Sequence, residues 1–250
     1  MDQRNYDPKG NSKERAVKDV AFHEAEPPAH LRGIVHRFLE LRTIDRLSSD
    51  YRFHALPDAC TYIVFDQTDP SVTGVTRLSA SSQELNLGRA FHFTNIRFLP
   101  GVWQRDRAPI EHGMIESHYR GDLPLVATNQ TLIGQDFAAK QAVLTRLVDD
   151  LLARGLLVAN PVTEKIFANI EQIHSVADMA EISELSPRQL QRVLKKTTGF
   201  TPHDFLKVLR LQQSLLSEPS LSYVDQSHFI HSFRKATGYT PAKYAQKFDV

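Results

Sequence analysis

The C-terminal part of the sequence contains one ten-residue pattern twice. The stretch "TTGFTPHDFL" begins at Thr197 and "ATGYTPAKYA" begins at Ala236, thirty-nine residues later (236 − 197 = 39). In each copy a glycine, which tolerates the left-handed backbone of a helix end, precedes an aromatic residue and a threonine–proline pair that suits a helix start. Each copy therefore predicts the end of one helix and the beginning of the next, so this region is expected to be helical and built from two similar units.

The residues before the first copy predict a helix with a defined start. Ser186 is a candidate N-cap, Pro187 suits the first helical position, and Gln189 completes a capping box. Leu190 and Leu194 fall on one face, which we expect to be buried. The opposite face carries hydrogen-bonding and cationic side chains: Arg188, Gln191, Arg192 and Lys195.

A short helix over 175–182 is expected to pack on this one. Its small residue Ala180 permits the close crossing that a helix-turn-helix requires. Adding the offset of thirty-nine residues gives the second unit, in which Asp225 replaces Ser186 as the N-cap and Phe233 replaces Leu194 in the core. The outer face of this second helix then holds Gln226, Ser227, Ile230, His231 and Arg234.

Positive charge follows the two units, although the whole chain has a net charge of only +1. Between Arg188 and Arg210 there are six basic residues and one acid, and between Arg234 and Lys247 there are four basic residues and no acid. Neutralised phosphates supply much of the affinity of proteins for DNA, so the two basic blocks favour a nucleic-acid surface. The common alternative is a pair of solvated helix faces.

The rest of the chain predicts a second domain of different class. Residues 1–20 lack an apolar period and are expected to be disordered, whereas 21–122 contain short alternating runs separated by turn residues and are expected to form an antiparallel β domain, barrel or sandwich-like. Residues 123–160 are expected to be a helical linker and 161–250 the helical domain. The fold class is therefore α+β in two domains.

Composition places limits on the compartment. The single cysteine, Cys60, cannot form an internal disulfide and is expected to be a buried small side chain. The polar start of the chain lacks the apolar core of a secretory signal, and no apolar run approaches the roughly 20 residues of a membrane span. We therefore expect a cytoplasmic protein without a membrane partner.

The two C-terminal stretches "LSPRQLQRVLKKTTGFTPHDFLKVLRLQQ" and "YVDQSHFIHSFRKATGYTPAKY" resemble the AraC/XylS transcription regulators. The resemblance covers roughly 167–248 and implies a double helix-turn-helix domain. It implies that recognition helices over 187–196 and 226–235 enter successive major grooves, held about 34 Å apart by a helix over 204–216. The candidate DNA-binding residues are Arg188, Gln189, Gln191, Arg192, Lys195, Gln226, Ser227, Ile230, His231 and Arg234.

A fainter resemblance links "LPDACTYIVFD" and "IRFLPGV" to the β-rich domain that precedes the DNA-binding domain in some of these regulators. It implies that this domain binds a small-molecule effector, forms a homodimer, or both. RNA polymerase is a further expected partner of such a regulator.

The sequence departs from the family pattern at three places. The family has a further short helix and turn where this chain has only 216–224, so either the second recognition helix has lost its support or the sequence omits about a dozen residues. We favour omission, because an unsupported helix would expose Phe229 and Phe233. Glu184 stands where a glycine is usual, and His231 stands where a basic residue is common.

Two other classes of protein remain as alternatives: an interaction scaffold that has lost DNA binding, and a cupin-like enzyme with a helical appendage. The sequence has no glycine-rich phosphate loop, nucleophile elbow or compact catalytic triad, so no catalytic residue or cofactor is expected. A metal is not expected either, because several histidines and glutamates in the β region lack a tight His-x-His pattern: His92, Glu111, His112, Glu116 and His118.

Overall fold

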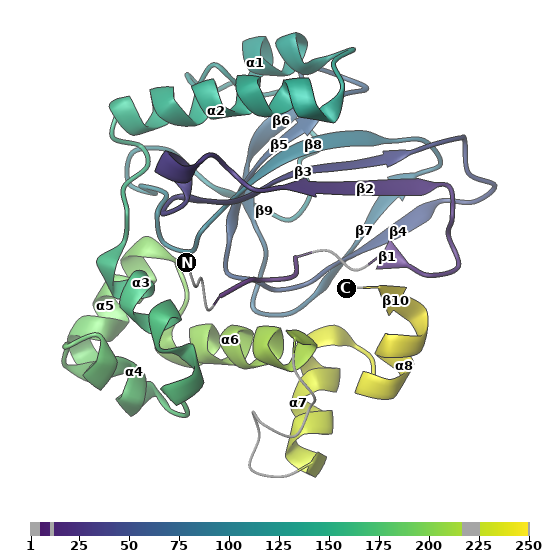
Figure 1. Ribbon diagram of the computed structural model, residues 1–250. Helices are drawn as coiled ribbons and strands as arrows, with labels where there is room; N and C mark the ends of the chain where they lie inside the picture. Colours follow the sequence, from purple (N-terminus) through teal and green to yellow (C-terminus); the bar gives the residue numbers. More distant parts are fainter. Residues whose placement is uncertain (1–5, 11–12, 217–225, 250) are drawn as a thin grey trace.

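The computed structural model describes residues 6–10, 13–216 and 226–249. Its β-strands form a middle layer, with two helices, α1 and α2, on one side and the C-terminal helices on the other (Figure 1). The fold class is α+β, with an antiparallel, sandwich-like β domain followed by a helical domain.

Six strands form the main sheet. Its order is β2-β3-β8-β5-β6-β9, and every neighbouring pair is antiparallel except β6–β9. Ile63 and Phe65 of β5 and Ile96 and Phe98 of β8 are fully buried, since alternate strand residues face the same side. The strand bounds are β2 (Val20–Ala25), β3 (Val35–Thr43), β5 (Thr61–Asp66), β6 (Thr73–Arg77), β8 (His92–Phe98) and β9 (Glu111–His112).

A second sheet faces the first and leaves the domain open rather than closed into a barrel. It pairs β4 (Tyr51–Ala55) with β7 (Gln83–Gly88). Leu39 of the main sheet packs with Ala55 and Leu78 between the two sheets. Cys60 is fully buried in the same cluster, as expected for a small apolar side chain.

Helices α1 (Leu125–Leu132) and α2 (Phe137–Ala153) cover the outer face of the main sheet (Figure 1). Leu125, Leu144 and Leu151 are fully buried in one cluster with Phe38 and Ile96. We expected 123–160 to be a linker between domains. These two helices instead belong to the core of the β domain, because their apolar faces have the sheet as a partner.

The C-terminal helices follow the order expected for two helix-turn-helix units. A short 3-10 turn, η2 (Ile170–Gln172), separates the first two helices, and another, η1 (Ala29–Leu31), precedes β3. The helices are α3 (Pro161–Ala168), α4 (Val176–Ile182), α5 (Pro187–Thr197), α6 (Pro202–Leu216), α7 (Gln226–Thr237) and α8 (Pro241–Lys247).

The prediction of disorder over 1–20 is wrong for the described residues 6–10 and 13–20. The Tyr6 ring stacks on Phe167 of α3 with centroids 4.4 Å apart, and the Tyr6 hydroxyl donates to Asp58 O (2.7 Å). The backbone of Lys9 both donates to and accepts from the Gln212 side chain of α6. This segment has too few apolar residues to show a period, and the contacts described above join it to residues far away in the sequence.

Strand β1 (Lys13–Glu14) pairs antiparallel with β10 (Phe248–Asp249), so the two domains also share a small sheet. Arg15 Nε donates to the carbonyl oxygens of Ala245 and Phe248, each at 3.1 Å. The Lys247 ammonium lies 3.0 Å from a Glu14 carboxylate oxygen. The β domain therefore contacts the helical domain at both ends of the latter.

Candidate nucleic-acid interface

The first unit begins with the predicted capping box. Ser186 Oγ accepts from Gln189 N–H (3.3 Å), and Gln189 Oε1 accepts from Ser186 N–H (2.9 Å). Leu190 and Leu194 are fully buried, and Gly199 ends the helix with a φ of 75°. Local sequence thus fixes both where α5 starts and which face it turns inward.

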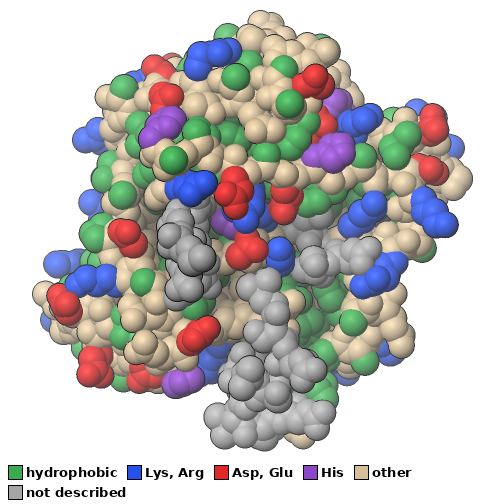
Figure 2. All heavy atoms as spheres, in the orientation of Figure 1, with side chains coloured by type: hydrophobic (Ala, Val, Ile, Leu, Met, Phe, Trp, Pro, Cys, Tyr) green, Lys and Arg blue, Asp and Glu red, His purple; other side chains and the backbone are tan. Residues whose placement is uncertain are grey.

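The outer face of α5 is open to solvent. Gln189 is exposed as well, but its Oε1 is engaged in the cap, which leaves its amide nitrogen as the polar group open to an outside partner. In the orientation of Figure 1, α5 lies at the lower left, where Figure 2 shows Lys and Arg side chains at the surface. The exposed candidates are Arg188, Gln189, Gln191, Arg192 and Lys195.

Glu184 occupies the turn between α4 and α5 with a φ of 56°, the left-handed conformation that usually requires glycine. Its carboxylate lies 2.8 Å from the Lys165 ammonium of α3, and this hydrogen bond lowers the pKa of Glu184. Both side chains are well exposed, so the ion pair offsets little of the backbone cost.

We expect Glu184→Gly to stabilise the protein by up to about 1 kcal/mol, since glycine removes the steric cost of the left-handed residue. Urea unfolding followed by Trp103 fluorescence measures this change. Glu181→Gly, an exposed position inside α4, is the matched control and should instead destabilise by about 1 kcal/mol. Equal destabilisation by both changes would show that the turn carries no strain.

The second unit repeats the geometry of the first. Phe229 and Phe233 of α7 are buried, Gly238 ends the helix with a φ of 81°, and Thr240 Oγ1 accepts from Lys243 N–H at the start of α8. Four candidates on the outer face are exposed: Ser227, Ile230, His231 and Arg234. The side chain of Gln226 and the predicted N-cap Asp225 lie outside what the structure describes.

The reason for favouring an omitted segment before α7 does not hold. Phe229 and Phe233 are each 3% exposed, because they pack in one cluster with Leu56 of the β domain, Leu211 of α6 and Tyr244 of α8. Leu56 of the β domain thus helps to bury Phe229 and Phe233, a role that the sequence analysis gave to a missing helix. The choice between a true deletion and an omitted segment concerns 216–223, and 217–225 lie outside the described residues.

Comparison with known proteins agrees with this geometry. Residues 179–247 match the family model described as a helix-turn-helix domain, so the match begins in α4 and ends with α8. A curated relative, the XylDLEGF operon transcriptional activator 2 of Pseudomonas putida, is 26% identical over 102 residues. The C-terminal helices are thus similar to a helix-turn-helix domain and to a transcriptional activator.

The curated relative is similar to only part of this chain. The aligned region covers 37% of this chain and 64% of the Pseudomonas putida activator, less than two thirds of that protein. Two solved structures of ToxT from Vibrio cholerae are similar in arrangement, with TM-scores of 0.41 and 0.40 at 9% identity. They cover 91% of this chain and 98% and 97% of the ToxT chains.

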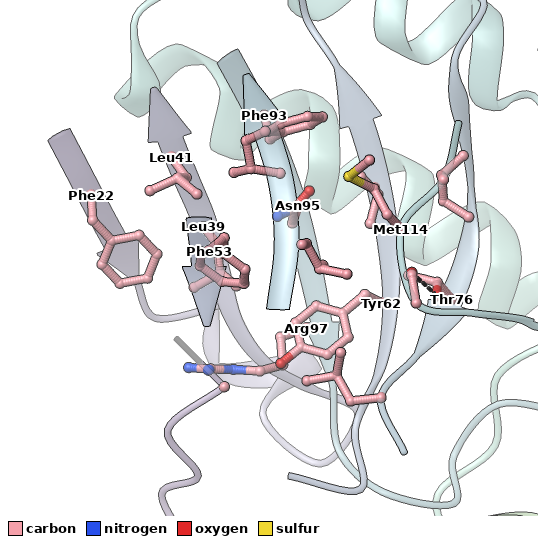
Figure 3. Close-up of a pocket in the computed structure, with 17 residues that line it drawn as sticks. Phe22, Leu39, Leu41, Phe53, Tyr62, Thr76, Phe93, Asn95, Arg97 and Met114 are labelled. Atoms are coloured by element: carbon pink, nitrogen blue, oxygen red, sulfur yellow. Dashed lines mark hydrogen bonds between the residues drawn. The ribbon is translucent and has the colours of Figure 1, made fainter. Parts of the chain in front are cut away.

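The β domain of this chain contains an apolar cavity of about 100 Å³ between its two sheets (Figure 3). Phe22, Leu41 and Phe93 line it with Met114, while Arg97 lies at one end. The Asn95 side chain faces it, and Asn95 Oδ1 is buried without a hydrogen-bond partner among the described residues. Sequence reasoning missed this cavity, because its walls come from strands far apart in the chain.

Arg97 is held in place by the β domain itself. Its Nε donates to His36 Nδ1 (2.9 Å), and its Nη2 donates to Glu24 (2.8 Å). Burial lowers the pKa of His36 to about 3, so its imidazole is neutral and accepts this bond. Because its charge is already paired with Glu24, Arg97 forms one end of the cavity and is not a free cation for a ligand.

Within 6–10, 13–216 and 226–249, no group of three or more His, Cys, Asp or Glu side chains is arranged to hold a metal ion. In the same parts of the chain, no helix combines the length and the apolar character needed to cross a membrane.

Proposed function

We propose that this chain is a sequence-specific DNA-binding transcriptional regulator that inserts α5 and α7 into adjacent major grooves. The observation that carries the proposal is the repetition of one device: two helices whose buried faces and glycine ends match, each with an exposed face of cationic and hydrogen-bonding side chains. An enzymatic function is less well supported, because the exposed faces of α5 and α7 do not form a concave pocket of the kind that binds substrates.

The candidate residues divide by chemistry. Arg188 and Arg192 suit bidentate bonds to guanine, and Gln191 suits adenine, because their donors and acceptors match those base edges. Lys195 and Arg234 lie toward the ends of their helices, where they suit phosphates. Ser227, Ile230 and His231 are the proposed readers of the second groove, together with Gln226.

The β domain is the proposed sensor. Its cavity is apolar and small, and Asn95 Oδ1 needs a donor, so a suitable effector is a compact apolar molecule with a hydroxyl or N–H group. Homodimerisation through this domain, contact with RNA polymerase and a cytoplasmic location complete the proposal. They rest on the kind of regulator that the C-terminal domain suggests.

Selection of bound duplexes from a random DNA pool with the full chain tests the proposal. We expect enrichment of two short motifs about one helical turn apart, one for each helix. The affinity for the enriched duplex should fall with salt, with log K decreasing by about 0.9 per log unit of salt for each phosphate neutralised. An interaction scaffold without DNA binding would enrich no sequence, because any weak retention of DNA by its basic residues would not depend on sequence.

A further inference from the structure

The β domain holds both recognition helices at the same position of the repeat. Thr198 follows α5 and Thr237 ends α7, and the two threonines are related by the sequence offset (237 − 198 = 39). Each hydroxyl donates to the carbonyl four residues earlier, Thr198 to Leu194 O (2.7 Å) and Thr237 to Phe233 O (2.9 Å). Each threonine carbonyl then accepts a hydrogen bond from a β-domain side chain.

Arg77, the last residue of β6, serves the first helix. Its Nη1 donates to Thr198 O, and its guanidinium lies over the Phe200 ring, 5.2 Å from the centroid. Arg105 lies alongside and donates to Lys195 O (3.3 Å). Two cations at the carbonyl end of α5 also complement the negative end of the helix dipole.

His54 of β4 serves the second helix. Its Nε2 lies 3.0 Å from Thr237 O, and since a carbonyl only accepts, Nε2 carries the proton. Nδ1 then accepts from the Tyr244 hydroxyl of α8 (3.3 Å), and the ring stacks on Phe248 at 5.1 Å. The His54 side chain is buried, so both its hydrogen bonds and its stacking fix where α7 ends.

Both anchoring strands are also walls of the cavity. Phe53, next to His54, and Thr76, next to Arg77, line it (Figure 3). Successive strand residues point to opposite faces, so each strand presents one side chain to the cavity and its neighbour to a recognition helix. Any shift of β4 or β6 on filling the cavity would therefore move one recognition helix relative to the other.

We propose that Arg77 and His54 are positioning residues that hold the recognition helices at one separation and so set the spacing of the two DNA motifs that the protein accepts. The inference rests on the proposed DNA-binding function. Neither side chain need touch DNA, because each acts through the helix end that it holds.

The test repeats the random-pool selection with an Arg77→Met/His54→Phe double variant of the full chain. These changes keep the bulk of both side chains but remove the donors to Thr198 O and Thr237 O. The wild-type chain should enrich one spacing between the two motifs. The variant should enrich the same motifs with several spacings, and its preference for the original spacing over one longer by a base pair should fall about 5- to 150-fold, the usual range of coupling between sites.

Conservative variants and a matched control separate positioning from general damage. His54→Gln retains an N–H donor and Arg77→Lys retains a cation, so each should restore most of the spacing preference. Arg52→Ala changes an exposed residue of the same β4 strand and should leave the spacing unchanged. Unfolding midpoints measured on every variant show whether the chain still folds, and if the double variant does not, each single change is selected separately.

Three results would overturn the inference. The double variant could enrich only the wild-type spacing, which would show that the two contacts do not set it. The double variant could instead bind that spacing more tightly than the wild-type chain, which would show that the contacts oppose DNA binding. The conservative variants could also enrich duplexes with as many different spacings as the double variant does. Failure of the wild-type chain to enrich any DNA is a different result, since it removes the proposed function itself and the inference with it.

Discussion

Arg188→Ala combined with Arg192→Ala is expected to weaken binding to the selected duplex by about 30-fold or more, because each bidentate base contact contributes about 1–3 kcal/mol. Both side chains are exposed on α5, so the free energy of unfolding should change by less than about 0.5 kcal/mol for each. Titration of labelled DNA at fixed salt, with the selected and a scrambled duplex, measures the effect.

Two further double variants show whether the loss of affinity comes from lost charge or from lost base contacts. Arg46→Ala with Arg52→Ala removes the same charge from exposed positions in the β domain and should leave affinity nearly unchanged. Arg188→Lys with Arg192→Lys keeps the charge but loses bidentate geometry, so binding to scrambled DNA should persist while discrimination falls. If the β-domain pair lost as much affinity as the α5 pair, net charge rather than base contact would explain the result.

Glu40→Leu is expected to be the most destabilising single change, at about 3–5 kcal/mol, because it leaves a buried ammonium without its counter-ion. Lys140 Nζ of α2 is fully buried and donates to Glu40 Oε1 of β3 (2.6 Å). Such a loss is a large share of the roughly 5–15 kcal/mol that holds a typical domain folded. Urea unfolding reported by Trp103, which is buried in the adjoining core, measures it.

The double change Glu40→Leu/Lys140→Met should recover most of that loss, since two apolar side chains need no partner. Arg42→Met is the control: its Nε lies 3.9 Å from the same carboxylate but is well exposed, so its loss should cost less than about 1 kcal/mol. If the double variant were as unstable as Glu40→Leu, the packing of the site rather than its charge would be responsible.

The same carboxylate gives the wild-type protein a dependence on pH. Burial alone would raise the pKa of Glu40, but hydrogen bonds from His92 and Lys140 outweigh it and lower the pKa to about 2, from 4.5. The stabilisation is therefore complete above pH 4.5 and is lost as the pH falls toward 2, by on the order of 3 kcal/mol. Glu40→Leu/Lys140→Met should lose less stability over this interval.

Features encoded by neighbouring residues could be predicted from the sequence. The capping box at Ser186, the left-handed ends at Gly199 and Gly238, and the buried faces of both recognition helices all depend on residues within one or two helical turns. The sequence repeat strengthened these predictions, because similar helix caps, glycine ends and buried faces recur thirty-nine residues apart. Contact of the outer faces with DNA stays a prediction.

Features that join distant residues could not be predicted. Nothing near His54 or Arg77 indicates that each meets a helix end more than a hundred residues away. Tyr6 lies in a polar stretch that reads as disorder, and Leu56 gives no sign that it covers Phe229 and Phe233. Such contacts depend on how the two domains dock, and the local periodicity of a sequence contains no information about docking.

The pairing of β1 with β10 has a consequence for the order of events during synthesis. Lys13 and its partner Asp249 are 236 residues apart (249 − 13 = 236), so β1 leaves the ribosome long before the strand that will complete it. The backbone groups of β1 remain unpaired until β10 has been synthesised, so the early strand has an open edge in the meantime. This small sheet therefore cannot close until residues 248 and 249 have been synthesised, and a nascent chain stalled before residue 248 would keep that edge open.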